Sequence, residues 1–289
     1  MSKQPYRIAL ITDSTSDLPQ NLRDEYCIYV APLYLLWGNE QYRDGVDITA
    51  EEFYERLPRS TIHPTTSQPT PGDFMNLLEQ AKRDGAEEAV IITISDKLSG
   101  TYDSALQAAE MEDIPVHVFD SRSVSMGLGF QVLAAARARD AGGDAQAMLA
   151  AAEKVRQHIN IIFTVDTLEY LHRGGRIGGA AKLIGTALQL KPQLIMSAES
   201  GVIEAGAKVR TRKKALESVF TAFVEKLNGH RNLHITVLHV CAQEEAEQLA
   251  KRLQDQYHVD ELIITSTSPV IGAHAGPGTV GVVGYAEVE

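Results

Sequence analysis

The sequence predicts an α/β protein of two domains: an N-terminal mostly parallel sheet with helices on both faces, and a C-terminal mixed or antiparallel sheet with helices. In the first half, short apolar runs alternate with helical patterns, which is typical of a parallel sheet covered on both faces. The second half contains a hairpin pattern and closing strands, which indicate antiparallel pairing. At 289 residues, 44% of them hydrophobic and 22% charged, the chain can fill one large domain or two moderate ones.

Four candidate strands lie in the first half, at Arg7–Ile11, Cys27–Leu36, Ala89–Ile94 and Val116–Phe119. Helical spacing of apolar residues predicts helices at Pro71–Asp84, Ser99–Glu110 and Gly127–Arg139. Polar clusters follow the first, third and fourth strands. Because ligands bind at the carboxyl ends of parallel strands, we expect the chemistry of the protein at this edge.

The second half begins with an alanine-rich helical stretch, Asp144–Gln157, from which we place the domain boundary near residue 157. The predicted domains are 1–157 and 158–289. Further strands are expected at Ile161–Val165, Leu233–Val240, Leu262–Thr265 and Val280–Val288, with a hairpin over Gln193–Arg210 that turns at Ser200 and Gly201. Helices are expected at Lys213–Leu227 and Glu244–Tyr257.

The composition excludes some classes of protein. A net charge of −11 argues against a nucleic-acid binder, which needs basic surface to displace counterions. The amino terminus does not resemble a signal peptide, and no stretch approaches the roughly 20 apolar residues of a membrane helix. We therefore expect a cytoplasmic protein with at most transient contact with a membrane surface. Cys27 and Cys241 lie in apolar stretches and are expected to be buried free thiols.

Two nucleotide motifs are rejected. Gly276–Gly281 has the glycine spacing of a dinucleotide fingerprint, but only eight residues follow it and they are expected to form a strand, not a helix. No glycine-rich run ends in Gly-Lys-Ser or Gly-Lys-Thr. A metal site is not expected either, because His274 has no second histidine or cysteine at ligand spacing.

Three polar residues invite a functional interpretation, although each also has a structural one. Thr66 and Ser99 precede predicted helices, where a hydroxyl often serves only as a cap. His274 is flanked by small residues that leave space beside its imidazole. Ser99 and His274 could also be the nucleophile and base of an acyl hydrolase, but no G-x-S-x-G elbow is present. The glycine-rich loop Arg173–Gly179 could bind an anion or be a flexible basic docking loop.

Six segments in the same order together resemble the DegV family, from the first predicted strand to the last. They are Ile11–Pro19, Thr66–Pro69, Leu98–Tyr102, Phe119–Arg122, Arg173–Gly179 and His274–Gly278. The resemblance implies a two-domain α/β protein that binds one fatty acid between its domains and has no cofactor. It also implies that the protein is the acyl-carrying subunit of a fatty acid kinase, whose separate ATP-binding subunit phosphorylates the carboxylate.

By the same resemblance, Thr66, Ser99 and His274 contact the carboxylate. We expect Arg173 and Arg176 to serve a partner surface instead, facing a kinase subunit or the phosphates of ATP together with Lys208, Arg210 and Arg212. Two alternatives stay open: a Ser99–His274 acyl hydrolase or transferase, and a fatty-acid sensor without a kinase partner.

Overall fold

The computed structural model describes residues 6–185, 190–227 and 231–287. Over these ranges the strands form three sheets, of four, six and three strands. The predicted fold class, α/β with one parallel and one mixed sheet, is confirmed. The last residue of the expected strand Val280–Val288 lies outside the described residues.

The first sheet has the strand order β2-β1-β6-β7, and all its neighbours pair in parallel. Its strands are β1 (Ile8–Asp13), β2 (Ile28–Ala31), β6 (Glu88–Thr93) and β7 (Val116–Asp120). One face packs on α3 (Pro71–Arg83) and α4 (Thr101–Glu110) through a cluster that includes Phe74, Leu78 and Ile91. A short 3-10 turn, η1 (Ser14–Ser16), and α1 (Gln20–Glu25) follow β1.

The second sheet is mixed, in the order β10-β9-β8-β13-β11-β12. Only β11 and β12 pair in parallel, while the other neighbours are antiparallel. Its strands are β8 (Asn160–Thr164), β9 (Gln193–Met196), β10 (Ile203–Ala205), β11 (Leu233–His239), β12 (Val259–Ser266) and β13 (Val280–Ala286). Helices α8 (Arg212–Leu227) and α9 (Gln243–Gln256) cover its outer face.

A third, antiparallel sheet was not expected. The prediction of one strand over Cys27–Leu36 is wrong, because Pro32 lies between β2 of the first sheet and β3 (Tyr34–Trp37) of the third. A proline has no backbone N–H to donate, so it ends the pairing of β2. β3 pairs with β4 (Glu40–Arg43) and β5 (Thr65–Ser67), and α2 (Ala50–Arg56) with the turn η2 (Leu57–Arg59) connects these two strands.

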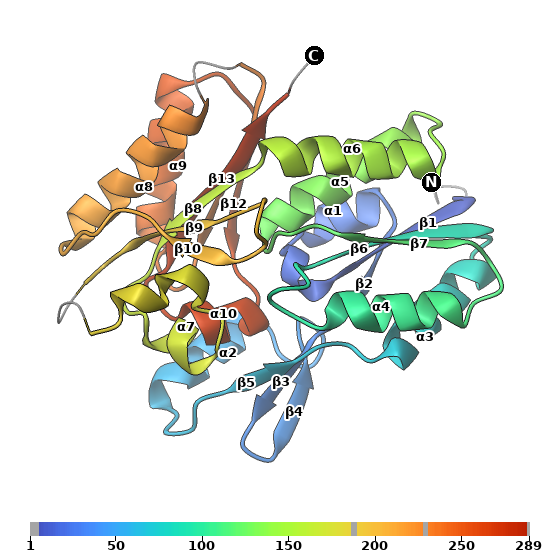
Figure 1. Cartoon of the computed structure of the whole chain (residues 1–289), viewed down its shortest axis with the longest axis horizontal. Helices are drawn as coiled ribbons and strands as arrows, with labels where there is room; N and C mark the ends of the chain where they lie inside the picture. Colours follow the sequence, from blue (N-terminus) through green and yellow to red (C-terminus); the bar gives the residue numbers. More distant parts are fainter. Residues whose placement is uncertain (1–5, 186–189, 228–230, 288–289) are drawn as a thin grey trace.

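Helix α5 (Met126–Asp140) is central to the molecule. With α6 (Ala145–His158) it packs in one cluster with residues of both large sheets, and α5 buries residues on all its sides. Figure 1 shows the resulting layers: α3 and α4, the first sheet, α5 and α6, the second sheet, then α8 and α9. The division near residue 157 falls at the end of α6 and stays a prediction.

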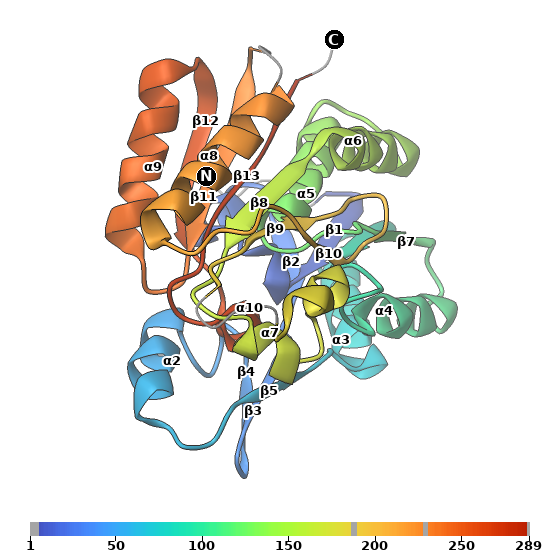
Figure 2. The same cartoon turned by 60° about the vertical axis from the view of Figure 1, so that its left-hand side comes forward.

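Two short helices from the second half meet below this stack. They are α7 (Glu169–Arg173), followed by the 3-10 turn η3 (Gly178–Leu183), and α10 (Pro269–Ala275). Figure 2 shows α7 and α10 beside each other, close to the third sheet. None of the helices in the described ranges is long and apolar enough to cross a membrane. Cys27 and Cys241 are free but exposed, contrary to expectation, because each lies in a left-handed turn at a strand end.

Candidate functional site: a cavity between the two large sheets

A cavity opens where both large sheets meet β5 and α10. Most of its lining is aliphatic or aromatic, and includes Ile94, Leu98, Ile161, Phe163, Leu171 and Leu238. This wall therefore favours apolar ligand groups, which leave water on binding.

The polar part of the cavity wall contains all three residues expected at a carboxylate. Thr66 comes from β5, Ser99 from the loop after β6, and His274 from the last turn of α10. The Oγ1 atom of Thr66 lies 2.7 Å from Nε2 of His274, a hydrogen bond between residues 208 positions apart. The fold thus brings segments from both halves of the chain to one point.

Neutral His274 is favoured in this environment. Burial lowers its pKa to about 4, and the nearby positive charge of Arg176 acts in the same direction. Its Nδ1 is buried and has no hydrogen-bond partner in the described part of the chain. That nitrogen faces Gly174, where a Cβ atom would lie only 2.0 Å away. Gly174 is therefore required for this close approach.

The hydroxyls of Thr66 and Ser99 are not helix caps. The N-cap of α3 is Thr70, whose side chain accepts from Asp73 N, while Thr66 lies in β5. The N-cap of α4 is Gly100, and Ser99 Oγ is instead 2.8 Å from Thr101 Oγ1. Both hydroxyls are thus free of the structural role that the sequence left open.

Arg176 lies on the cavity wall, although it was expected to face a partner, and its partner role stays a prediction. Its Nε donates to Leu98 O at 2.9 Å and its Nη1 to Gly174 O at 2.8 Å. These carbonyls belong to the loop that carries Ser99 and to the turn that touches His274. Arg176 therefore ties the two sides of the site together.

The other predicted basic residues are placed differently. Arg173 is exposed at the end of α7 and forms an ion pair with Glu169. Lys208 and Arg210 are exposed in the segment between β10 and α8. Arg212 is engaged by Glu245 and donates to Gly278 O, so its guanidinium links α8 and α9 to the loop before β13.

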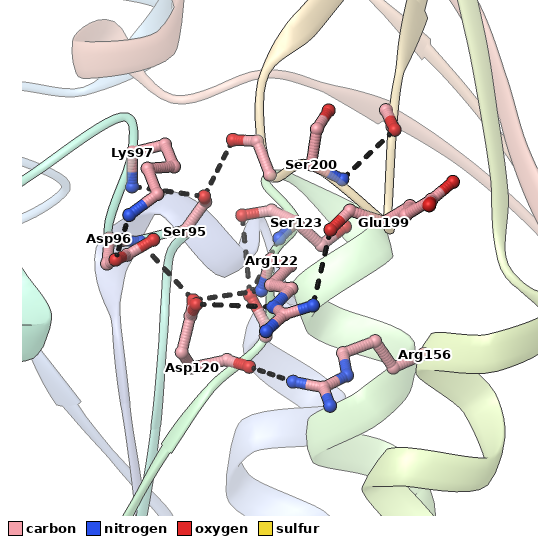
Figure 3. A network of polar contacts seen from close by, with 12 residues as sticks. Ser95, Asp96, Lys97, Asp120, Arg122, Ser123, Arg156, Glu199 and Ser200 are labelled. Atoms are coloured by element: carbon pink, nitrogen blue, oxygen red, sulfur yellow. Dashed lines mark hydrogen bonds and ion pairs between the residues drawn. The ribbon is translucent and has the colours of Figure 1, made fainter.

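Sequence reasoning missed a polar contact between the sheets at the cavity edge. The Oγ atom of buried Ser95 donates to Gly201 O at 2.7 Å, and Arg122 Nη1 donates to Glu199 O at 3.2 Å. Figure 3 shows these side chains reaching from the first sheet to the turn between β9 and β10. These two hydrogen bonds fix the turn that precedes Ile203, a residue of the cavity lining.

Other polar lining residues were also missed, among them Thr15, Gln68, Ser125 and Thr267. Thr15 and Gln68 lie within the segments that resemble the DegV family, and this was the one sign in the sequence that they belong to the site. Ser125 and Thr267 had no signal, because only the fold brings them to the cavity. Over the described ranges no group of three or more His, Cys, Asp or Glu side chains could hold a metal ion.

Residues 7–287 match the sequence model of a protein family, which is described as "Uncharacterised protein, DegV family". The chain belongs to the DegV family. A DegV domain-containing protein of Halalkalibacterium halodurans is 36% identical over 282 residues, covering 97% of this chain and 99% of that relative.

Two solved structures are similar to this chain over nearly its whole length. A fatty-acid-binding DegV family protein from Thermus thermophilus superposes with a TM-score of 0.91 at 38% identity, covering 97% of this chain and 100% of that one. A stearic-acid-binding protein from Eubacterium ventriosum has a TM-score of 0.89 at 27% identity, covering 97% and 98%.

Proposed function

We propose that this protein binds one long-chain fatty acid, with its tail in the cavity and its carboxylate at Thr66, Ser99 and His274. The observation that carries the proposal is the convergence of these three side chains on the wall of a largely apolar cavity. The similar folds of a fatty-acid-binding DegV protein and of a stearic-acid-binding protein support it.

The head site suits a carboxylate. An anion taken from water needs several hydrogen bonds to offset the loss of hydration, and hydroxyl groups donate such bonds. A neutral imidazole can donate from Nε2 when its proton is on that nitrogen, which leaves Nδ1 as the unpartnered buried atom. Arg176 adds positive charge nearby, although its Nε and Nη1 already donate to backbone carbonyls.

The tail supplies most of the affinity. Roughly 14 methylenes at about 0.8 kcal/mol each give an upper limit near 11 kcal/mol for transfer from water. Binding retains only part of this, because the chain and the cavity wall lose freedom. The head therefore governs which amphiphile is selected, and the tail governs how tightly it is held.

A hydrolase is less well supported by the geometry. Serine hydrolysis needs a hydrogen bond from the nucleophile to the base and a group that orients the base. In the described part of the chain, Ser99 bonds to Thr101 and His274 to Thr66, and no carboxylate meets Nδ1 of His274. A fatty-acid carrier does not need hydrogen bonds between a nucleophile, a base and an orienting group.

We also propose that the carrier presents the carboxylate to a separate ATP-binding kinase subunit, which forms an acyl phosphate. Hydroxyl and imidazole contacts hold the anion without the fixed bidentate grip of an arginine, so that one oxygen can react. Exposed Arg173, Lys208 and Arg210 offer positive charge to a partner or to ATP phosphates. A sensor without a kinase partner would not need these contacts, and pull-down from lysate distinguishes it.

Head-group selectivity tests the proposed site. Delipidated protein is titrated with hexadecanoic acid and with hexadecanol, and selectivity is the ratio of the alcohol Kd to the acid Kd. Thr66→Val removes a hydrogen bond to a charged group, about 1.5–3 kcal/mol, so selectivity should fall roughly tenfold to a hundredfold while alcohol binding stays. Unchanged selectivity in both Thr66→Val and His274→Ala would show that these residues are structural.

A further inference from the structure

Helix α10 connects the second sheet to the carboxylate site. It has only seven residues, Pro269–Ala275, and carries His274 in its last turn. Helices this short are unstable alone, so tertiary contacts must set its position. At its carboxyl end Thr279 Oγ1 donates to Ala275 O at 3.0 Å and to Gly276 O at 2.8 Å.

The amino end of α10 is held by a carboxylate from the first half of the chain. Asp17 Oδ1 accepts from Ser268 N at 2.9 Å, and Asp17 Oδ2 accepts from Ser125 Oγ at 2.5 Å. Ser125 lines the cavity and has φ 54° and ψ −146°, a region that residues other than glycine rarely adopt. Asp17 thus joins a strained segment of the cavity wall to the start of α10.

A second carboxylate lies beside the first. Asp44 is 2% exposed, accepts from Ser14 Oγ at 2.7 Å, and lies 3.4 Å from Val270 N. Negative charge at the amino end of a helix stabilises the unpaired N–H groups there. The two carboxylates reach α10 from different segments, the turn after β1 and the turn after β4, so they fix it in two directions.

A buried carboxylate, Asp44, and a partly buried one, Asp17, are a costly way to hold one helix end. Burial raises the pKa of Asp17 to about 7 and that of Asp44 to about 6, so keeping them ionised opposes folding near neutral pH. The N-cap of α10 is a serine, Ser268, but its side chain makes no cap hydrogen bond. The arrangement is therefore explained better by positioning of α10 than by stability.

We propose that Asp17 and Asp44 are positioning residues of the carboxylate site, which act through α10 to hold His274 against Thr66. The inference rests on the proposed function and assigns the residues that set the geometry of its head site. Neither carboxylate needs to touch the fatty acid.

The test measures head-group selectivity, as defined above, in delipidated full-length Asp17→Asn and Asp44→Asn variants. Each variant should lose roughly tenfold in selectivity, because the acid Kd rises while the hexadecanol Kd stays within about twofold. Asp113→Asn removes an exposed carboxylate that pairs with Lys82, and serves as the control with parental selectivity. Ser14→Ala keeps the Asp44 carboxylate and removes its hydrogen bond from Ser14 Oγ, together with the one that Ser14 Oγ accepts from Leu33 N. It should give a smaller loss and covers the case in which an Asn variant does not fold.

The other outcomes overturn the proposal. Parental selectivity with only a lower Tm would show that the carboxylates are purely structural. Equal loss of acid and alcohol binding would show a damaged cavity rather than a displaced His274. A parent protein that binds both compounds equally would contradict the proposed function itself, and this inference with it.

Discussion

At the scale of single residues, His274 is the most informative group in the cavity. It is mostly buried, its Nε2 bonds to Thr66 and its Nδ1 has no partner in the described part of the chain. Its environment disfavours the imidazolium in the ligand-free protein. A bound carboxylate would change that environment directly, so the titration of His274 reports on the head site.

We predict that the pKa of His274 is about 4 without ligand and rises when a fatty acid binds. The negative charge of the carboxylate favours the protonated imidazole, and the proton-binding constant should increase by at least about tenfold. Histidine NMR titration measures this, with His274→Gln identifying the signal among nine histidines. Hexadecanol is the control, since it fills the cavity without charge. Equal titration curves with acid and alcohol would place the carboxylate elsewhere.

At the scale of elements, the close contact between α7 and α10 determines where the imidazole lies. Gly174 follows Arg173 at the end of α7, and any side chain there would occupy the space of His274. The site therefore depends on how these two short helices pack, and not only on its three polar side chains.

Gly174→Ala should displace the imidazole, because its Cβ would lie 2.0 Å from Nδ1. We expect at least about tenfold lower selectivity for hexadecanoic acid over hexadecanol, on the scale of one lost hydrogen bond to a charged group. Gly179→Ala is the matched control, since a Cβ atom there would come no closer than 3.6 Å, to Ile203 O. Titration of both variants checks the prediction, and parental selectivity in Gly174→Ala would contradict it.

The elements also show how far the sequence can be interpreted. The strands that form the cores of both large sheets were predicted, because short continuous apolar runs such as Ala89–Ile94 are typical of buried strands. The third sheet was missed, since β3 and β4 are short and Pro32 falls inside an otherwise apolar run. Ser99 was a possible N-cap in the sequence, but the N-cap of α4 is Gly100. Local patterns do not reveal which short segments pair across distant parts of a chain.

The site was predicted less fully than the fold. Thr66, Ser99 and His274 do line one cavity, but this expectation came from resemblance and not from spacing. Arg176 was separated from them because its side-chain direction is invisible in the sequence. Asp17 lies in Ile11–Pro19, one of the segments that resemble the DegV family, but no role was predicted for it. Its partners Ser125 and Ser268 are more than 100 positions away in the sequence.

At the scale of the whole molecule, Arg173, Lys208 and Arg210 are exposed cations in a chain with a net charge of −11. We predict that Arg173→Glu combined with Lys208→Glu and Arg210→Glu leaves fatty-acid content unchanged but strongly lowers acyl-phosphate formation with a cognate kinase subunit and ATP. Association should also become less sensitive to salt, because the attractive charges are gone. Arg176 is excluded from this variant because it lines the cavity.

Lys251→Glu, on the exposed side of α9, is the matched control for charge reversal and should behave like the parent. Normal acyl-phosphate formation by the triple variant would contradict a partner role for these three cations. Loss of bound fatty acid from that variant would instead place them at the cavity.

The central claim is that this chain carries a fatty acid, and lipid extraction tests it most directly. Protein purified from a bacterial host is denatured, extracted with organic solvent and analysed by mass spectrometry. The account predicts roughly one long acyl chain with a free carboxyl group per protein molecule. Protein that yields no fatty acid and takes up none when hexadecanoic acid is added would contradict it.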